Sequence, residues 1–286
     1  MNNSITIITA FFDIGRGNWN AKSGRSDRLE RTADTYFEHF QRLAKLDNKI
    51  IVFTSPDLKD KVLKLREGKP THIITINLHQ KFKYIIEKIS SIQHSYSFKS
   101  LIKIEQLQNP EYWSAEYVLI NNLKPYFIHK AIKSGLSGQE LIAWVDFGYI
   151  RREKTRYGLV KWAHPFDRSK VHLFSIKKDL DLQNEQAVMD KVINNETYII
   201  GGVIVATKEK WIEFYQLVFQ IQKKLIQSGV IDDDQGVFLI CASQKPSLFK
   251  LNYLGHMEWF KVFRLFNKGS KVNYLTRLEI LLRRIK

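Results

Sequence analysis

The chain has 286 residues, of which 44% are hydrophobic and 26% charged. These ordinary globular values exclude disorder as its main feature and allow one large domain or two small ones. Its 45 lysines and arginines exceed its 29 aspartates and glutamates, giving a net charge of +16 that favours nucleic acid, an anionic membrane surface or a phosphorylated ligand. The single cysteine, Cys241, excludes an intrachain disulfide and a cysteine-built zinc site.

The N-terminal segment MNNSITIITAFFDIGR has no basic region before its apolar residues, and Asp13 interrupts it early. It is therefore predicted to be a strand and not a signal peptide. No apolar stretch approaches the length of about 20 residues that spans a bilayer. These features predict a cytoplasmic protein.

The first 80 residues alternate between strand and helix patterns. Apolar, β-branched runs predict strands over 5–12, 49–54 and 72–76, and helical spacing of apolar residues predicts helices over 27–46 and 57–67. This alternation is typical of an α/β fold in which parallel strands are joined by right-handed crossovers. Ligands of such sheets bind at the carboxyl ends of the strands.

The rest of the chain continues the pattern without a repeat or an obvious linker. A helical insertion is expected over 80–107, and further helices and strands are predicted over 112–132 (helix), 141–145 (strand), 198–206 (strand), 208–228 (helix) and 249–254 (strand). We therefore expect one domain over 1–268 with a mostly parallel central sheet. A basic amphipathic helix is predicted over 269–286.

Two acidic segments are candidates for chemistry. Asp146-Phe147-Gly148 ends a buried strand, where a carboxylate would face the ligand crevice, unless it is a solvated strand end with a turn. Asp232-Asp233-Asp234-Gln235 offers a general base for an acceptor hydroxyl and an amide for a substrate. The alternative is a helix start, where aspartate caps the first turn.

Two further features have equally open interpretations. His256 suits Mn²⁺ beside a carboxylate, although a lone histidine is more often a structural hydrogen-bonding group. The loop over 13–19 follows the first strand and matches neither GxGxxG nor a P-loop. Its Arg16 suits a phosphate and its Trp19 a stacked base, whereas the alternative is an ordinary surface loop.

Several segments together carry a resemblance to a known family. The chain resembles the HtrL/YibB family of bacterial proteins, associated with lipopolysaccharide and other surface-polysaccharide gene clusters, over most of residues 5–266. The matching segments are FFDIGRGNW (11–19), NPEYWSAEYVLINNLKPYFI (109–128), WVDFGYIR (144–151), GGVIVATKEKW (201–211) and DDDQGVFL (232–239).

That family's pattern is in turn similar to GT-A-fold glycosyltransferases, which implies roles for particular positions. The resemblance implies catalytic roles for Asp233, Asp234 and Gln235. It implies nucleotide-sugar binding by residues of the first loop, the strand end and the glycine pair: Ala10, Phe11, Asp13, Arg16, Asp146, Phe147, Gly148, Arg151, Gly201 and Gly202.

The resemblance also implies a Mn²⁺ or Mg²⁺ ion on the donor diphosphate, held by Asp146 and His256. The sequence departs from the DxD pattern, because Gly148 stands where a second carboxylate is expected. Either Asp146 and His256 share the ion, or arginines and lysines neutralise the diphosphate.

The implied activity is transfer of a sugar from a nucleotide-diphosphate sugar, with UDP the expected nucleotide, to a saccharide or lipid-linked acceptor in lipopolysaccharide, O-antigen or capsule biosynthesis. The alternatives are a non-catalytic membrane-surface protein and a nucleic-acid-binding protein. Residues 151–178 and 261–286 each carry a net charge of +7, leaving +2 elsewhere. This concentration of charge favours an enzyme peripheral to the inner face of the cell membrane over a binder of nucleic acid.

Overall fold

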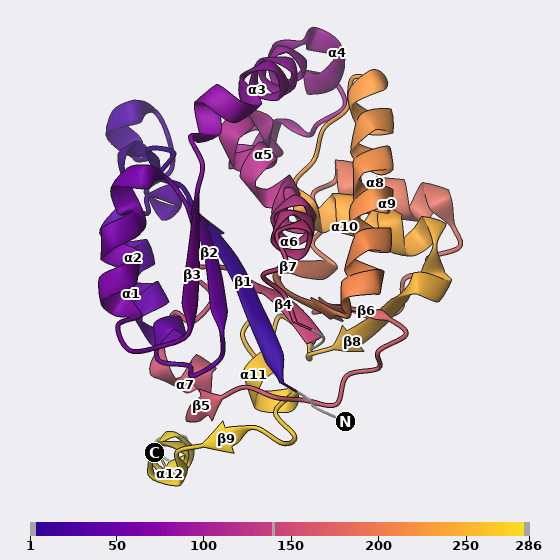
Figure 1. Cartoon of the computed structure of the whole chain (residues 1–286). Coiled ribbons are helices and arrows are strands. Elements are labelled where there is room, and N and C mark those ends of the chain that lie inside the picture. The colour runs from indigo at the N-terminus through magenta and orange to yellow at the C-terminus, as the bar shows by residue number, and fades with distance from the viewer. Residues whose placement is uncertain (1–3, 139–140, 283–286) are drawn as a thin grey trace.

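The computed structural model describes residues 4–138 and 141–282 (Figure 1). A central seven-stranded sheet has the order β3-β2-β1-β4-β7-β6-β8. Among its strands β7 runs opposite to the other six. The strands of this sheet are β1 (Ile5–Phe11), β2 (Ile50–Thr54), β3 (Thr71–Thr75), β4 (Leu141–Val145), β6 (Val171–Ser175), β7 (Ile199–Ala206) and β8 (Phe249–Tyr253).

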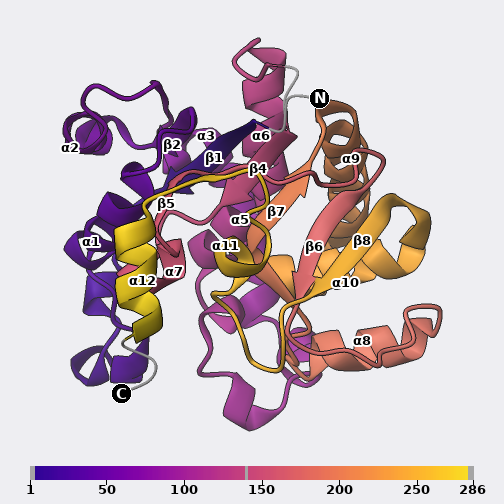
Figure 2. The same cartoon turned by 90° about the horizontal axis from the view of Figure 1, so that it is seen from below.

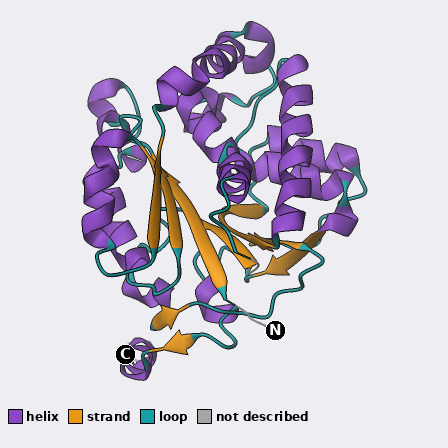
Figure 3. Ribbon diagram, in the orientation of Figure 1, coloured by secondary structure: helices purple, strands orange, loops and turns teal. Residues whose placement is uncertain are grey.

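Helices cover both faces of this sheet (Figure 3). Helices α6, α8, α9 and α10 pack on one face, and α1, α2 and α11 pack on the other. The helices are α1 (Ala33–Ala44), α2 (Lys59–Leu65), α3 (Leu78–His94), α4 (Tyr96–Lys99), α5 (Ala115–Asn122), α6 (Lys124–Lys133), α7 (Glu153–Arg156), α8 (Glu185–Ile193), α9 (Lys208–Gln227), α10 (Asp234–Gln244), α11 (Val262–Leu265) and α12 (Tyr274–Leu282). The predicted α/β class, with a mostly parallel central sheet and flanking helices, is confirmed.

The strand sequences explain why both faces are covered. Every residue of β1 is buried, and its side chains alternate between the two cores: Ile7 packs beside α1, whereas Ile8 packs toward α6. A strand buried on both faces is apolar throughout and not alternately polar. The continuous apolar run that predicted this strand follows from that position in the sheet.

The helix predicted over 112–132 is in fact two helices. Helix α5 ends at Asn122, and α6 begins at Lys124 with Pro125 in its first turn. Proline has no backbone N–H to donate into a preceding turn, and its ring collides with the carbonyl four residues earlier. The break places Lys124 at the start of a new helix, pointing into the protein.

The insertion has a core of its own. Helix α3 packs against α5, and α4 packs against α3. Ile89, Ile92 and Phe98 share one hydrophobic core with Val118 and Leu119. It covers the end of the molecule opposite α12 in Figure 1. The insertion also packs against the rest of the protein, because α5 contacts α6 and α10 and α3 contacts α9.

The C-terminal helix also begins later than predicted. Residues Lys271–Val272 form β9, which pairs with β5 (Leu159–Lys161), and α12 starts only at Tyr274. The burial of Leu159 in the main core holds β5 in place. The segment after Ser270 then pairs with β5 as a strand and does not yet form a helix. Arg277 fixes α12 to the turn before β5 by stacking over the Tyr157 ring at 4.4 Å. Figure 2 shows α12 beside α7 and β5. The predicted helix residues 283–286 lie outside the described residues.

Candidate functional site

A cavity of about 340 Å³ lies where β1 and β4 end and β7 begins. The sheet's order places β1 beside β4, so the chain crosses from one half of the sheet to the other at this point. This is where α/β sheets open a crevice for ligands. The residues predicted by sequence that line it are Ala10, Phe11, Asp13, Arg16, Asp146, Phe147, Gly148, Arg151, Gly201, Gly202, Asp234 and Gln235.

The sheet register brings the strand end and the glycine pair together. Val145 pairs with Val203, and the Asp146 backbone N–H donates to the Gly202 carbonyl at 2.8 Å. Because β7 is antiparallel to β4, its first residues lie at the carboxyl end of β4. Gly201 and Gly202 therefore form the wall of the cavity next to Asp146.

A buried lysine joins the two acidic segments. The Lys124 ammonium lies 3.0 Å from Asp146 Oδ1 and 2.6 Å from Asp234 Oδ2, and it donates to the Gly201 carbonyl at 3.0 Å. The Trp144 indole N–H also donates to Asp146 Oδ1, at 2.7 Å. Segments more than 80 residues apart thus share one buried charge cluster.

Burial changes the acid–base properties of this cluster. It raises the pKa of Asp234 to about 7, with the carboxylates of Asp233 and Asp146 adding to the rise and Lys124 opposing it. Burial lowers the pKa of Lys124, but Asp146 and Asp234 outweigh it and leave that pKa above its ordinary value. Lys124 is therefore charged at neutral pH, and Asp234 takes up a proton more readily than an ordinary aspartate.

Cationic side chains also line the cavity. Arg16 donates to the Tyr36 hydroxyl at 2.7 Å and to the Leu29 carbonyl at 3.2 Å, and Arg151 lies 4.8 Å from the centre of the Phe260 ring. Within residues 4–138 and 141–282, neither these arginines nor Arg31 form a salt bridge, although all three line the cavity. These three arginines suit the cavity to an anionic ligand.

Three predicted residues do not line this cavity. Asp233 caps α10, and its Oδ1 accepts the Gln235 backbone N–H at 3.0 Å. Trp19 is buried edge-on against Trp113, with ring centroids 4.6 Å apart, so it offers no face to a nucleotide base. His256 is exposed in the loop after β8.

The donor set around Asp146 does not fit the expected Mn²⁺ or Mg²⁺ ion. Asp146 Oδ1 already accepts from Trp144 and Lys124, and Asp234 Oδ2 accepts from Lys124. Among the described residues, no three histidine, cysteine, aspartate or glutamate side chains gather to hold a metal ion. Hard divalent cations need several free oxygen ligands, and here a lysine ammonium already contacts one oxygen of each carboxylate.

Sequence reasoning missed Lys124, although a signal was present. On α6 the buried positions include Lys124, Phe127, Ile128 and Ala131, so the lysine continues the apolar spacing of a buried face. A buried lysine is rare unless it is paired. The lining residues Arg31 and His39 had no such signal. Arg31 precedes an ordinary amphipathic helix, and His39 lies within it.

The fold and the site define an α/β protein with a charged ligand cavity at the carboxyl ends of its strands. The chain belongs to the HtrL/YibB family: residues 3–268 match the family model described as "Bacterial protein of unknown function (HtrL_YibB)". Protein HtrL of Escherichia coli (strain K12) is 50% identical to it over 284 residues, which cover 99% of this chain and 100% of that protein. The family resemblance predicted from the sequence motifs is confirmed.

Two solved structures of transferases align with most of the chain. Mouse xyloside xylosyltransferase 1 in its apo form has a TM-score of 0.39 and 10% identity, covering 87% of this chain and 84% of that one. The inositol-1-phosphate CTP transferase from T. maritima has a TM-score of 0.41 and 12% identity, covering 89% and 87%. Both scores are below 0.5, so neither likeness carries weight for the function of this chain.

Proposed function

We propose that the protein is a glycosyltransferase that moves a sugar from a nucleotide-diphosphate sugar, with UDP as the first nucleotide to test, to a saccharide or lipid-linked acceptor of surface-polysaccharide biosynthesis. One observation carries the proposal: a single cavity brings buried Asp234 and half-exposed Asp146 together with Arg16, Arg31 and Arg151. The carboxylates suit sugar hydroxyls, and the arginines suit a diphosphate. The motif resemblance to GT-A glycosyltransferases adds support.

The residues have distinct tasks in such a transfer. The bond between the sugar anomeric carbon and the β-phosphate oxygen breaks, and its electron pair leaves on the nucleoside diphosphate. The acceptor oxygen forms the new bond to the anomeric carbon. The arginines stabilise the charge that develops on the leaving phosphate. In an inverting reaction the acceptor proton passes to Asp234, whose raised pKa of about 7 suits a general base. In a retaining one the acceptor proton passes to the departing phosphate oxygen, and Asp234 orients the sugar.

Removing either cavity carboxylate tests this proposal. Asp146→Asn and Asp234→Asn are each expected to lower kcat/KM by about a hundredfold or more, because each removes a charge that faces the reacting groups. The donor is first found by thermal shift with UDP-, GDP- and CMP-sugars. Turnover is then followed as release of UDP or GDP, or of CMP if a CMP-sugar proves to be the donor.

Asp60→Asn is the matched control, because this exposed carboxylate lies on α2, outside the cavity. It is expected to retain wild-type turnover. Wild-type turnover in both Asp146→Asn and Asp234→Asn, with folding intact, would contradict the assignment of this cavity as the active site.

The second part of the proposal concerns location: α12 docks a cytoplasmic enzyme on the inner face of the cell membrane, near a lipid-linked acceptor. Leu275, Leu278 and Leu282 of α12 are 76%, 54% and 55% exposed. The exposed lysines Lys268 and Lys271 precede them. In residues 4–138 and 141–282 no helix has the length and apolar character to cross a membrane. Exposed leucines beside lysines suit an anionic lipid surface.

Leu275→Glu with Leu278→Glu is expected to weaken binding to vesicles of anionic phosphatidylglycerol about tenfold or more, since each buried leucine contributes roughly 1.5–3 kcal/mol. Cosedimentation measures the bound fraction, with neutral phosphatidylcholine vesicles as the comparison lipid. Tyr84→Glu on α3 is the control, because Tyr84 is 80% exposed and lies at the other end of the molecule (Figure 1). Unchanged binding of the double variant would refute the docking role.

A further inference from the structure

Lys124 is a fixed cation with no free donor. Its side chain is 4% exposed, and its ammonium contacts Asp146 Oδ1, Asp234 Oδ2 and the Gly201 carbonyl at 3.0, 2.6 and 3.0 Å. An ammonium has three N–H donors, so these three oxygens use all of them. Lys124 therefore cannot hydrogen-bond a phosphate directly, and its charge acts on the two carboxylates.

The surroundings hold Lys124 in this position. Its ammonium also lies 5.9 Å from the centre of the Trp144 ring, and the neighbouring α6 residues Phe127 and Ile128 are fully buried. The break before Pro125 starts a helix at this residue and fixes the direction of its side chain. The lysine is thus built into the core behind the cavity.

The three oxygens around Lys124 are a donor set for a hard cation. Two carboxylates and a backbone carbonyl are ligands that Mn²⁺ and Mg²⁺ accept, yet all three already bind the ammonium. The ammonium places one positive charge between Asp146 and Asp234 without any ion from solution. The positive charge that a metal ion would place between these carboxylates is already supplied by the Lys124 ammonium.

Besides Lys124, the arginines Arg16, Arg31 and Arg151 line the cavity. Arg31 donates to the carbonyls of Arg28 and Glu30, which keeps its guanidinium in place. Burial and then the positive charge of Arg31 lower the pKa of Arg151, so these two like charges lie near one another. A diphosphate at this position relieves that repulsion.

We infer that the Lys124 ammonium replaces a divalent cation between Asp146 and Asp234, and that the protein binds its diphosphate donor without metal, through Arg16, Arg31 and Arg151. The identity of the donor rests on the proposed function. The replacement of the metal by Lys124 does not rest on it. Lys124 is a positioning residue in this scheme, because it contacts the carboxylates and not the substrate.

Binding of Mn²⁺ alone, followed by electron paramagnetic resonance, tests the inference without any nucleotide sugar. Wild type is expected to bind no Mn²⁺ stoichiometrically. Lys124→Ala leaves three oxygens without a cation and is expected to gain one Mn²⁺ site, which Lys124→Ala with Asp146→Asn loses. Lys49→Ala is the matched control, because its ammonium contacts the Leu136 carbonyl and no carboxylate among residues 4–138 and 141–282; it is expected to gain no site.

Two results would overturn the inference. One is stoichiometric Mn²⁺ binding by wild type that Asp146→Asn abolishes, which needs no Lys124 variant to fold. The other is a folded Lys124→Ala that fails to bind Mn²⁺. A melting-temperature shift by the nucleotide donor is expected to be the same in EDTA and in Mn²⁺. If no sugar nucleotide binds under either condition, the proposed function fails while the Mn²⁺ result still decides the role of Lys124.

Discussion

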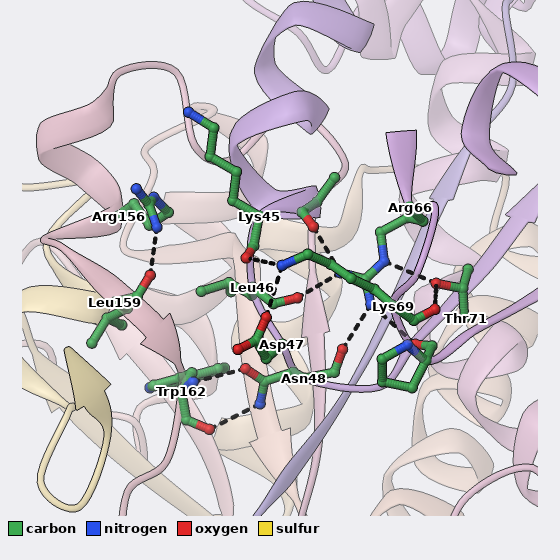
Figure 4. A network of polar contacts seen from close by, with 12 residues as sticks. Lys45, Leu46, Asp47, Asn48, Arg66, Lys69, Thr71, Arg156, Leu159 and Trp162 are labelled. Carbon is green, nitrogen blue, oxygen red and sulfur yellow. Dashed lines mark hydrogen bonds and ion pairs between the residues drawn. The ribbon is translucent and has the colours of Figure 1, made fainter. Parts of the chain in front are cut away.

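Replacing Arg66 with methionine is expected to lower the free energy of unfolding by about 3–5 kcal/mol. Arg66 follows α2, and its side chain, only 2% exposed, fills the space between the ends of α1 and β3 (Figure 4). It makes five hydrogen bonds, to Thr71 Oγ1 (2.9 Å) and to the carbonyls of Ala44 (2.8 Å), Leu46 (2.5 Å), Asn48 (2.9 Å) and Pro70 (3.0 Å).

The size of this effect follows from what remains after the substitution. Methionine nearly matches the volume of the arginine stem, so the main loss is of donors and not of packing. A charged hydrogen-bond donor would be lost by four backbone carbonyls, those of Ala44, Leu46, Asn48 and Pro70. Hydrogen bonds to charged groups contribute about 1.5–3 kcal/mol each, and unpaired buried acceptors add a penalty. Burial lowers the pKa of Arg66 only to about 10, so the charge is present at neutral pH.

Arg42→Met is the matched control for this prediction. Arg42 pairs with Glu38 one turn earlier on the outer face of α1, at 2.6 Å. An exposed pair of this kind contributes about 1 kcal/mol or less. Urea unfolding followed by circular dichroism compares the two variants. An equal loss of unfolding free energy in both would show that the hydrogen bonds of Arg66 stabilise the protein no more than an exposed ion pair does.

The strands and the cavity edge were predictable because they depend on local patterns. Apolar β-branched runs identify buried strands, and parallel order then fixes which end of each strand opens toward a ligand. This is why Asp13, Asp146 and Arg151 were expected near one another, and the structure places all three around one cavity. The sequence carried no signal for the direction of the strand after residue 198: nothing in its glycine pair indicates that β7 runs antiparallel to β4.

The remaining details depend on contacts between distant segments. Asp233 and Asp234 are adjacent, yet one carboxylate caps α10 and the other reaches Lys124. The residue at which α10 begins decides whether Asp233 or Asp234 points inward. A run of three aspartates does not show which of them is the first residue of the helix. Similarly, the position of His256 depends on a loop after β8 that no periodicity describes. Arg66 lies in a polar stretch whose sequence resembles an exposed helix end.

Gly201→Ala is expected to lower the free energy of unfolding by about 3–5 kcal/mol and to abolish transfer. Gly201 lies in the buried part of β7, and a Cβ there would stand 1.6 Å from Asp234 Oδ2 and 2.5 Å from its Cγ. The Asp234 carboxylate cannot yield by a small rotation, because it is buried and bonded to Lys124. The added methyl group must push it off the ammonium, which leaves a buried charge unpaired.

A double-mutant cycle separates this collision from a general intolerance of β7 to side chains. The three atoms nearest to the added Cβ all belong to Asp234, so Gly201→Ala is expected to cost less than about 1 kcal/mol when Asp234→Ala is already present. Gly17→Ala is the external control, since its Cβ would meet Thr32 at an ordinary 3.5 Å. Urea unfolding of the four proteins gives the coupling. Equal costs of Gly201→Ala in both backgrounds would mean that the glycine serves the strand itself, whereas a large coupling would mean that it makes room for the carboxylate that Lys124 holds.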